Sequence, residues 1–243
     1  MVFVYTGTPG SGKSYHATER IDILLRRGVN IIANYVVKKT HRHKGEFIYK
    51  NNDDLSVEFL IRYALEKHER RKESQTVVVI DEAHIMFNSR GYDMKERLRW
   101  LKFLSCSRHL GYDIIMITQS DKAIDMQVRG LIEFNCKHRK LTSYGGFKSL
   151  LLVTVCRRKF VSVKYWYVID EKCDAYFFNI KKKVANLYDS WAMFDMELDL
   201  IDEVKGKKSA KNNMRDEIAE FNKRYQIPIL TDEKEENHEE PTT

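Results

Sequence analysis

A glycine-rich loop lies close to the start of the chain, where residues 7–14 read GTPGSGKS. This octet fits the pattern G-x-x-x-x-G-K-[ST], in which glycines let successive backbone N–H groups turn toward one anion. An apolar run precedes the octet and a helical pattern follows it, which is the context that the motif requires. The predicted phosphate-binding residues are Gly7, Thr8, Pro9, Gly10, Ser11, Gly12, Lys13 and Ser14.

Two acidic residues end a candidate central strand, within the segment VVVIDEAH at 77–84. Its apolar run favours a buried parallel strand, so Asp81 is expected at the strand's carboxyl end beside the phosphate loop. There Asp81 and Ser14 are expected to hold Mg²⁺, while Lys13 reaches the β- and γ-phosphates of ATP. Glu82 is the predicted general base that polarises an attacking water. An Asp-Glu pair after a strand also occurs in solvated turns, so this interpretation depends on the phosphate loop.

Polar residues also end the next buried strand, at 112–119. Thr118 and Gln119 are placed to sense the γ-phosphate or to orient the water, because ligands bind at the carboxyl ends of strands in such sheets. A neighbouring subunit of an oligomeric ATPase supplies an arginine that stabilises the transition state. Arg129 and Arg108 are the candidates for that role, although both positions also suit a surface salt bridge.

Strand and helix patterns alternate along the first 141 residues. Strands are expected at 2–6, 29–37, 76–81, 112–119 and 133–141, and helices at 13–27, 53–71, 93–109 and 121–132. This alternation predicts an α/β P-loop NTPase fold, a mostly parallel sheet with helices on both faces. Residues 149–169 are expected to add a β-hairpin with a basic turn at 157–159. Asp53 or Asp54 is the expected cap of the second helix.

The chain has an excess of basic residues, with 42 Lys and Arg against 35 Asp and Glu. Because the segment 231–243 holds six acidic residues and one lysine, the rest of the chain is more basic than the total indicates. A basic body favours polyanions or an anionic membrane surface as partners. The segments 38–46 and 157–159 are candidate nucleic-acid contacts, and they fit solvated loops equally well. The four cysteines follow no zinc pattern.

Three regions are predicted from pattern and composition. They are a P-loop ATPase domain at 1–200, a linker with an amphipathic C-terminal helix at 201–230, and an acidic disordered tail at 231–243. No apolar run approaches the roughly 18–20 residues that span a bilayer, so no intrinsic transmembrane segment is expected.

Beyond the separate motifs, residues 78–140 resemble the N-terminal ATPase domain of the zonular occludens toxin (Zot) family and the gene I assembly proteins of filamentous phages. The resemblance is carried by DE…FNSR at 81–90, RHLGYDII at 108–115, TQ at 118–119 and R..IE at 129–133. The segment NLYDSWAMFD at 186–195 is similar to the one that closes the family's domain, so the likeness covers roughly residues 1–195.

The resemblance implies an ATP-hydrolysing motor, related by fold to hexameric DNA translocases, that drives assembly and export of filamentous phage particles. It implies a homo-oligomeric ring, ATP and Mg²⁺ as cofactors, and phage coat protein, phage DNA or a membrane assembly partner as partners. It places the protein in the cytoplasm, peripheral to the inner face of the bacterial host membrane, and it strengthens Arg129 as the trans-acting arginine. Family members commonly carry a transmembrane helix and an outer region that this sequence lacks, so no toxin activity is expected.

Three other functions remain open at this point. A DNA translocase or packaging ATPase would act directly on phage or plasmid DNA, with turnover that depends steeply on salt. A nucleotide-gated scaffold would bind ATP and hydrolyse it negligibly. A small-molecule kinase uses a similar loop, but the sequence shows no lid-like arginine cluster. The resemblance and the absence of an N-K-x-D motif favour ATP over GTP.

Overall fold

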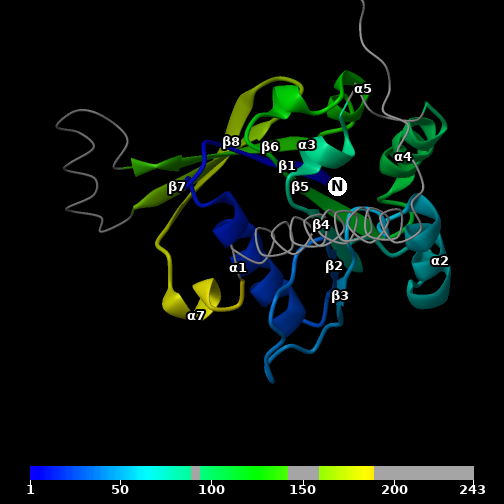
Figure 1. Cartoon of the computed structure of the whole chain (residues 1–243), viewed down its shortest axis with the longest axis horizontal. Coiled ribbons are helices and arrows are strands. Elements are labelled where there is room, and N and C mark those ends of the chain that lie inside the picture. Colours follow the sequence, from blue (N-terminus) through cyan, green and yellow to red (C-terminus); the bar gives the residue numbers. More distant parts are fainter. Residues whose placement is uncertain (89–93, 142–158, 189–243) are drawn as a thin grey trace, which may run out of the picture. The chain divides into compact units, whose positions relative to one another are not determined.

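Strands from both ends of the described chain assemble into one sheet (Figure 1). The computed structural model describes residues 1–88, 94–141 and 159–188, and the structural statements below concern these residues. Within them the strand order is β3-β2-β4-β5-β1-β6-β7-β8. Every pairing from β3 to β6 is parallel, whereas β7 and β8 are antiparallel to their neighbours. The expected α/β fold with a mostly parallel sheet is therefore confirmed.

The strands are short, and the central ones are buried on both faces. Their bounds are β1 Val2–Thr6, β2 Asn30–Ala33, β3 Phe47–Tyr49, β4 Thr76–Ile80, β5 Tyr112–Ile117, β6 Phe134–Lys140, β7 Phe160–Trp166 and β8 Glu171–Phe178. β4 is buried at all five positions, which explains its continuous apolar run. Because β4, β5 and β1 are parallel neighbours, the segments that follow them emerge at the same edge of the sheet.

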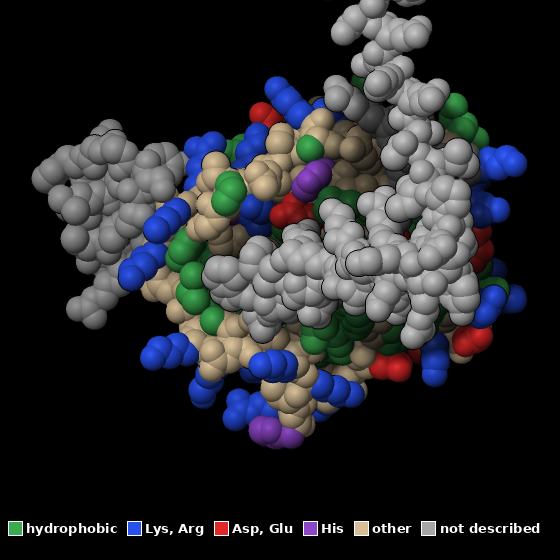
Figure 2. Space-filling model, in the orientation of Figure 1, with side chains coloured by type: hydrophobic (Ala, Val, Ile, Leu, Met, Phe, Trp, Pro, Cys, Tyr) green, Lys and Arg blue, Asp and Glu red, His purple; other side chains and the backbone are tan. Residues whose placement is uncertain are grey.

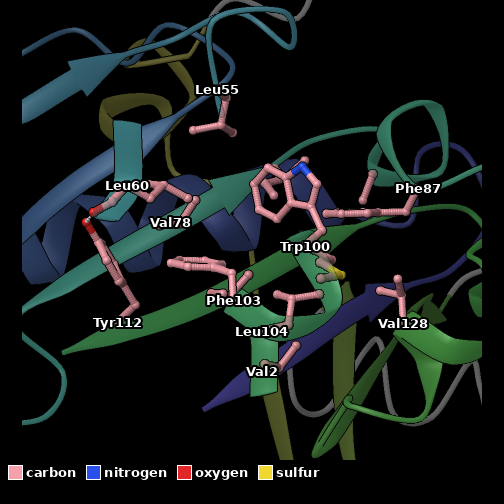
Figure 3. Close-up of a cluster of buried hydrophobic side chains, with 14 of the residues drawn as sticks. Val2, Leu55, Leu60, Val78, Phe87, Trp100, Phe103, Leu104, Tyr112 and Val128 are labelled. Carbon is pink, nitrogen blue, oxygen red and sulfur yellow. Dashed lines mark hydrogen bonds between the residues drawn. The ribbon is translucent and has the colours of Figure 1, made fainter. Parts of the chain in front are cut away.

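Helices cover both faces of the sheet, as expected. They are α1 Lys13–Arg26, α2 Val57–Lys67, α3 Ala83–Met86, α4 Met94–Cys106, the 3-10 helix η1 Asp121–Ala123, α5 Met126–Arg129 and α7 Lys182–Ala185. On one face, Ile21 and Leu25 of α1 pack with Val77 of β4. On the other face, α2, α4 and α5 pack over Val78, and Trp100 of α4 lies in the middle of that cluster (Figure 3).

Several predicted boundaries differ from the observed ones. The strand expected at 29–37 ends at Ala33, and the short strand β3 and the single-turn helices α3 and α7 were not predicted. The second helix begins after Ser56, whose hydroxyl accepts a hydrogen bond from the Phe59 N–H at 3.2 Å, so neither Asp53 nor Asp54 is the cap. The helix expected at 121–132 is divided into η1 and α5.

The sheet is extended by a β-hairpin, although its strands differ from the predicted ones. β7 ends at Trp166, and a turn at 167–170 leads into β8, a strand that was not predicted. The expected first strand of the hairpin and most of its basic turn lie outside the described residues, as do the C-terminal helix and the predicted domain boundaries. No helix in the described ranges is both long and apolar enough to cross a membrane.

Candidate nucleotide-binding site

The glycine-rich loop joins the end of β1 to the start of α1 at the carboxyl edge of the sheet. Its glycines at 7, 10 and 12 all have positive φ, at 145°, 71° and 89°. The Gly7 N–H donates to the Gln119 carbonyl oxygen at 3.2 Å, and a Cβ on Gly7 would lie 2.4 Å from the His138 carbonyl oxygen. The loop therefore needs glycine for its backbone shape and, at Gly7, also for lack of space.

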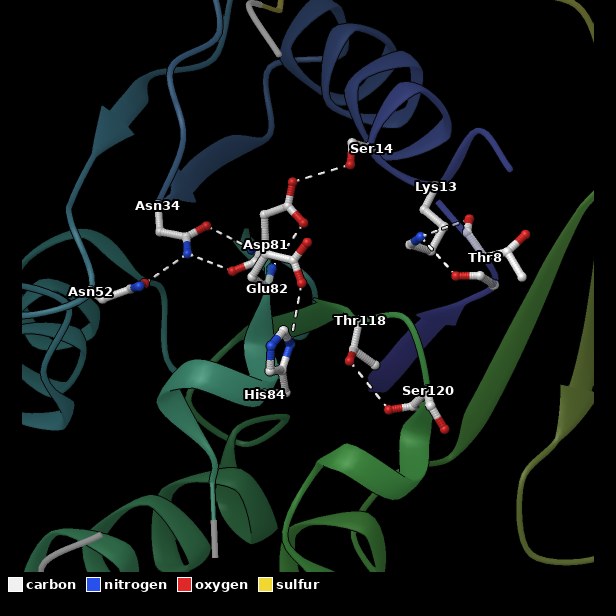
Figure 4. Close-up of polar contacts among 11 residues, drawn as sticks. Thr8, Lys13, Ser14, Asn34, Asn52, Asp81, Glu82, His84, Thr118 and Ser120 are labelled. Atoms are coloured by element: carbon white, nitrogen blue, oxygen red, sulfur yellow. Dashed lines mark hydrogen bonds and ion pairs between the residues drawn. The ribbon is translucent and has the colours of Figure 1, made fainter. Parts of the chain in front are cut away.

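The lysine of the motif is held on the inner side of this loop (Figure 4). The Lys13 ammonium donates to the carbonyl oxygens of Gly7 and Thr8 at 2.8 and 3.2 Å. Burial lowers the pKa of Lys13, and the carboxylates of Glu82 and Asp81 act in the opposite direction. These contacts fix a cation beside the loop's backbone N–H groups, where it can bind a phosphate.

The hydroxyl of Ser14 and the carboxylate of Asp81 meet across the gap between α1 and β4. Ser14 Oγ donates to Asp81 Oδ2 at 3.1 Å, and the Glu82 N–H donates to Asp81 Oδ1 at 2.9 Å. The Asp81 side chain is buried, and this burial raises its pKa. A bound divalent cation would favour its charged form. Two hard oxygen donors in contact, one of them a carboxylate, fit Mg²⁺, which is bound through one or two such groups plus substrate phosphates.

Asn34 fixes the backbone of Asp81, a contact that sequence reasoning missed. Asn34 Nδ2 donates to the Asp81 carbonyl oxygen at 2.8 Å, and the Asp81 N–H donates to Asn34 Oδ1 at 2.7 Å. Asn34 Nδ2 also donates to Asn52 Oδ1 at 2.8 Å (Figure 4). Both groups of the Asp81 backbone are thus satisfied by one buried side chain, which holds the carboxylate in place.

Glu82 lies at the turn between β4 and α3. Its backbone is left-handed with φ of 47°, a conformation that a residue other than glycine adopts at a cost of about 1–2 kcal/mol. Its carboxylate lies 3.2 Å from His84 Nδ1, and both side chains are about one-third exposed (Figure 4). The partnership with His84 was not predicted. It leaves the Glu82 side chain beside the buried Asp81, with its Oε2 atom buried and the side chain as a whole about one-third exposed.

The residues predicted from the next strand take different positions. Thr118 is buried, and its hydroxyl donates to the Ser120 carbonyl oxygen at 3.2 Å. The Gln119 side chain is exposed, whereas its carbonyl oxygen accepts the Gly7 N–H described above. Arg129 lies on α5, partly buried beside Tyr167, and Arg108 is exposed and pairs with Glu73 at 3.5 Å.

Aromatic side chains and two histidines support the loop from behind. A Cβ on Gly12 would lie 3.2 Å from the rings of Phe160 and Phe178. His138 Nδ1–H donates to the Cys136 carbonyl oxygen at 2.8 Å, so its Nε2 accepts the His16 Nδ1–H at 2.8 Å. Burial lowers the pKa of His16 to about 3 and that of His138 to about 4. Both rings are therefore neutral, and neither was assigned a role from sequence.

The family model described as zonular occludens toxin (Zot) matches residues 1–194 of this chain, with the phosphate loop and the Asp81 turn inside the match. The chain belongs to the Zot family. Among curated proteins, this Zot-family chain is 29% identical over 134 residues to the gene 1 protein of Salmonella phage IKe and 28% identical over 134 residues to that of Enterobacteria phage I2-2. Each match covers 53% of this chain and 37% of the relative, so the chain spans well under half of these relatives.

Solved structures with a similar fold include one from the same family. The N-terminal domain of the zonular occludens toxin from Neisseria meningitidis is 19% identical, with 77% of this chain and 98% of that chain covered and a TM-score of 0.49. B204, the DNA-packaging ATPase from Sulfolobus turreted icosahedral virus, is 16% identical, with 74% and 97% covered and a TM-score of 0.49.

Proposed function

We propose that this Zot-family chain is an ATP-hydrolysing motor for filamentous phage-type assembly and export at the cytoplasmic membrane. The observation that carries the proposal is the contact between Ser14 Oγ and Asp81 Oδ2, 3.1 Å apart, beside the loop that holds Lys13. The arrangement supports the proposal because the Lys13 ammonium, the Ser14–Asp81 pair and the Glu82 side chain lie around the glycine-rich loop, as a phosphate site with a bound metal would require. The gene 1 relatives support the assembly role. The membrane protein that works with the motor would come from the phage or from its host.

Each residue has a distinct part in the proposed reaction. Lys13 and the backbone N–H groups of the loop bind the β- and γ-phosphates and stabilise the charge that develops on them. Ser14 and Asp81 would hold Mg²⁺, which neutralises phosphate charge when bound. Glu82 takes a proton from the attacking water, with His84 limiting the orientations of its carboxylate. Gln119 orients that water or senses the γ-phosphate.

The motor is proposed to act as a homo-oligomeric ring at the inner face of the membrane. In such a ring Arg129 of one subunit, which lies beside Tyr167 in this chain, would contact the γ-phosphate bound by the next. Phage coat protein, phage DNA and a membrane assembly protein are the proposed partners.

A second function, translocation or packaging of DNA itself, is favoured by a separate observation. Exposed lysine and arginine side chains that form no ion pair with another described residue gather on one surface, described below. Such a surface suits a polyanionic track. The two functions share the ATPase chemistry and differ in the ligand that stimulates it.

The test is the steady-state ATPase rate of the full chain, alone and with single-stranded DNA, duplex DNA or anionic liposomes. Lys13→Ala is expected to abolish nucleotide binding and turnover together. Glu82→Gln is expected to lower kcat by about 10²–10⁴-fold and to leave nucleotide affinity nearly unchanged, because it removes the base and keeps the shape. Turnover that is unaffected by Glu82→Gln would exclude Glu82 as the general base, and nucleotide binding without turnover under every condition would replace the motor with a nucleotide-gated scaffold.

A further inference from the structure

A dense group of cations covers the surface around the C-terminal end of α1. The seven residues of this basic surface are Arg27, Lys38, Lys39, Arg42, Lys44, Lys182 and Lys183, and all are exposed. They come from the end of α1, the loop that follows β2, and α7. Figure 2 shows Lys and Arg side chains gathered at the lower end of the molecule, where Figure 1 places that loop and α7.

Backbone contacts join these three segments into one surface. The Lys44 N–H donates to the Leu25 carbonyl oxygen at 2.8 Å, which joins the loop to α1. The Lys38 N–H donates to the Leu187 carbonyl oxygen at 2.8 Å, which joins the loop to the segment after α7. Residues that lie 140 positions apart in sequence therefore display their charges together.

A buried polar contact holds the loop in place from below. His43 is buried, and its Nε2 lies 2.9 Å from Asp22 Oδ1 on α1. Its Nδ1 accepts the Thr40 N–H at 3.2 Å, so Nε2 carries the hydrogen and donates it to the carboxylate. The loop's cations are thus presented on a backbone that is already ordered, which lowers the entropy that a ligand must remove on binding.

The two α1 carboxylates nearest to the surface, Asp22 and Glu19, are already paired with other groups. Asp22 pairs with Arg26 as well as His43, and Glu19 pairs with Lys181 and accepts a hydrogen bond from the Tyr176 hydroxyl. None of the seven side chains of the basic surface forms an ion pair with another described residue. Like charges gathered without partners repel one another, so the surface is suited to an anionic ligand with several charges.

The small apolar area of the basic surface favours one class of anionic ligand over another. Val184 and Leu187, next to the lysines of α7, point inward and are 6% and 8% exposed. Val36 and Ile180, each about half exposed, and Ile23 of α1, 41% exposed, are large apolar side chains at its margins. Membrane-surface binding scales with buried apolar area as well as charge, and this surface offers mainly charge. Repeated phosphates in a flexible or helical polymer fit it better than a bilayer.

The surface is also connected to the nucleotide site. α1 runs from Lys13 in the phosphate loop to Arg26 at the edge of the basic surface. The start of α7 is fixed to the first turn of the same helix, because the Lys181 N–H donates to the Tyr15 hydroxyl at 3.0 Å. A ligand on the basic surface would therefore contact α7 and the end of α1, the helix that begins in the phosphate loop.

From these observations we propose that the basic surface binds the sugar–phosphate backbone of a nucleic acid, without regard to base sequence. This inference deepens the proposed motor function and rests on it, because the motor function explains why the chain would bind nucleic acid. The binding itself requires no ATP turnover. In the proposed motor, Arg27, Lys39, Arg42 and the other residues of the basic surface would contact the nucleic acid along which the motor moves.

The experiment measures fluorescence anisotropy of labelled 30-nucleotide single-stranded and duplex DNA with the full chain, without nucleotide, between 50 and 200 mM salt. The test variant combines Lys39→Glu, Arg42→Glu, Lys182→Glu and Lys183→Glu. The control combines Arg62→Glu, Lys67→Glu, Arg70→Glu and Lys102→Glu, exposed cations of the opposite face, and lowers the net charge equally. Circular dichroism melts verify that both variants fold.

We expect the wild type to bind at least one of the two DNAs and the test variant to bind it about 100-fold more weakly. The slope of log affinity against log salt should fall in magnitude by about 2–3, since each lost phosphate contact removes about 0.7–0.9. The control should stay within about threefold of the wild type.

Several outcomes would overturn the proposal. They are no binding of either DNA by the wild type at 50 mM salt, equal losses in both variants, and retention of affinity by the test variant. Sedimentation with phosphatidylglycerol-containing vesicles adds one more, because a test variant that loses vesicle binding while retaining DNA binding identifies an anionic bilayer as the ligand. If DNA binding depends on the basic surface and the wild type hydrolyses no ATP, the motor function fails while this inference stands.

Discussion

The nucleotide site lies at the start of α1, the basic surface extends from the end of that helix to α7, and the two regions are built on different principles. At the nucleotide site, several polar groups are buried and fixed by hydrogen bonds, as in the Ser14–Asp81 contact and the two bonds between the Asn34 side chain and the Asp81 backbone. At the basic surface, the functional groups are exposed, and the buried contact of His43 with Asp22 lies beneath them.

This difference determines how each region responds to change. A buried group that loses its partner costs about 1–3 kcal/mol, so single substitutions at the nucleotide site should have large effects. Each exposed cation contributes a small part of the total binding free energy for a polyanion. The affinity of the basic surface should therefore fall gradually as charges are removed. The predictions below test this contrast, beginning with the largest expected effect.

Replacing Gly7 by alanine should have the largest effect. Its φ is +145° and the added Cβ would lie 2.4 Å from the His138 carbonyl oxygen, so the loop must move. We expect a loss of more than about 3 kcal/mol in the free energy of unfolding, measured by urea denaturation, together with loss of nucleotide binding.

Gly10→Ala is the matched control in the same loop. Its φ is +71°, but nothing lies within 4 Å of the added Cβ, so backbone strain of about 1–2 kcal/mol is the whole expected cost. Equal effects of the two substitutions would show that space behind the loop is unimportant.

Asn34→Ala should be next in size. The substitution leaves the buried N–H and carbonyl oxygen of Asp81 without their partner, at a cost of about 1–3 kcal/mol in the free energy of unfolding. Turnover should also become more dependent on Mg²⁺ concentration, because the Asp81 carboxylate is less firmly placed. Asn52→Ala removes one bond of Asn34 and should cost less; an Asn34→Ala chain as stable as the wild type contradicts the assignment.

The histidine pair behind the loop predicts a dependence of stability on pH. Burial depresses the pKa of His16 to about 3 and that of His138 to about 4, against about 6.5 in the unfolded chain. Below pH 6.5 the unfolded chain binds more protons, so stability falls as pH falls, by about 1.4 kcal/mol per pH unit for each histidine, until the folded state also protonates.

The His16→Gln substitution removes one titrating ring of this pair. Between pH 6 and 5, its free energy of unfolding should therefore fall by about 1.2 kcal/mol less than that of the wild type. Thermal or urea unfolding at closely spaced pH values measures the difference. Parallel curves for the two proteins would mean that the ring is already charged in the folded state.

The smallest effect is expected for a single cation of the basic surface. Lys39→Ser removes one of seven charges, so DNA affinity at 100 mM salt should fall by less than about threefold. Anisotropy titrations detect this change. A loss of more than tenfold from this one substitution would mean that the surface, like the nucleotide site, depends on a specific contact.

The sequence predicted the parts of the site that follow from a motif or from the end of an apolar run. The phosphate loop, Asp81 and the central strands belong to this group, because burial on both faces leaves a continuous apolar signal in β4. What the structure bears out there is the position of these residues. The assigned roles of the phosphate loop, Lys13, Ser14, Asp81, Glu82, Gln119 and Arg129 stay predictions, to be tested by the kinetics above.

The missed contacts depend on where elements end and on tertiary pairing. Asn34 was placed inside a strand expected to reach residue 37, whereas β2 ends at Ala33 and leaves Asn34 at the sheet edge beside Asp81. The three-residue strand β3 has too little sequence to carry a pattern of its own. The pairing of His16 with His138 joins residues 122 positions apart, which no local pattern reveals.

The position of β1 bears on how the chain reaches its native state. β1 lies between β5 and β6, with Val4 opposite Met116 on one side and Asn135 on the other. Its partners are thus more than 100 residues later in the chain, and pairing of such high contact order is slow. During synthesis the glycine-rich loop leaves the ribosome well before β5 and β6, so it acquires its supporting strands late. A chain that stops before β6 therefore contains the whole loop and lacks one of the two strands that pair with β1.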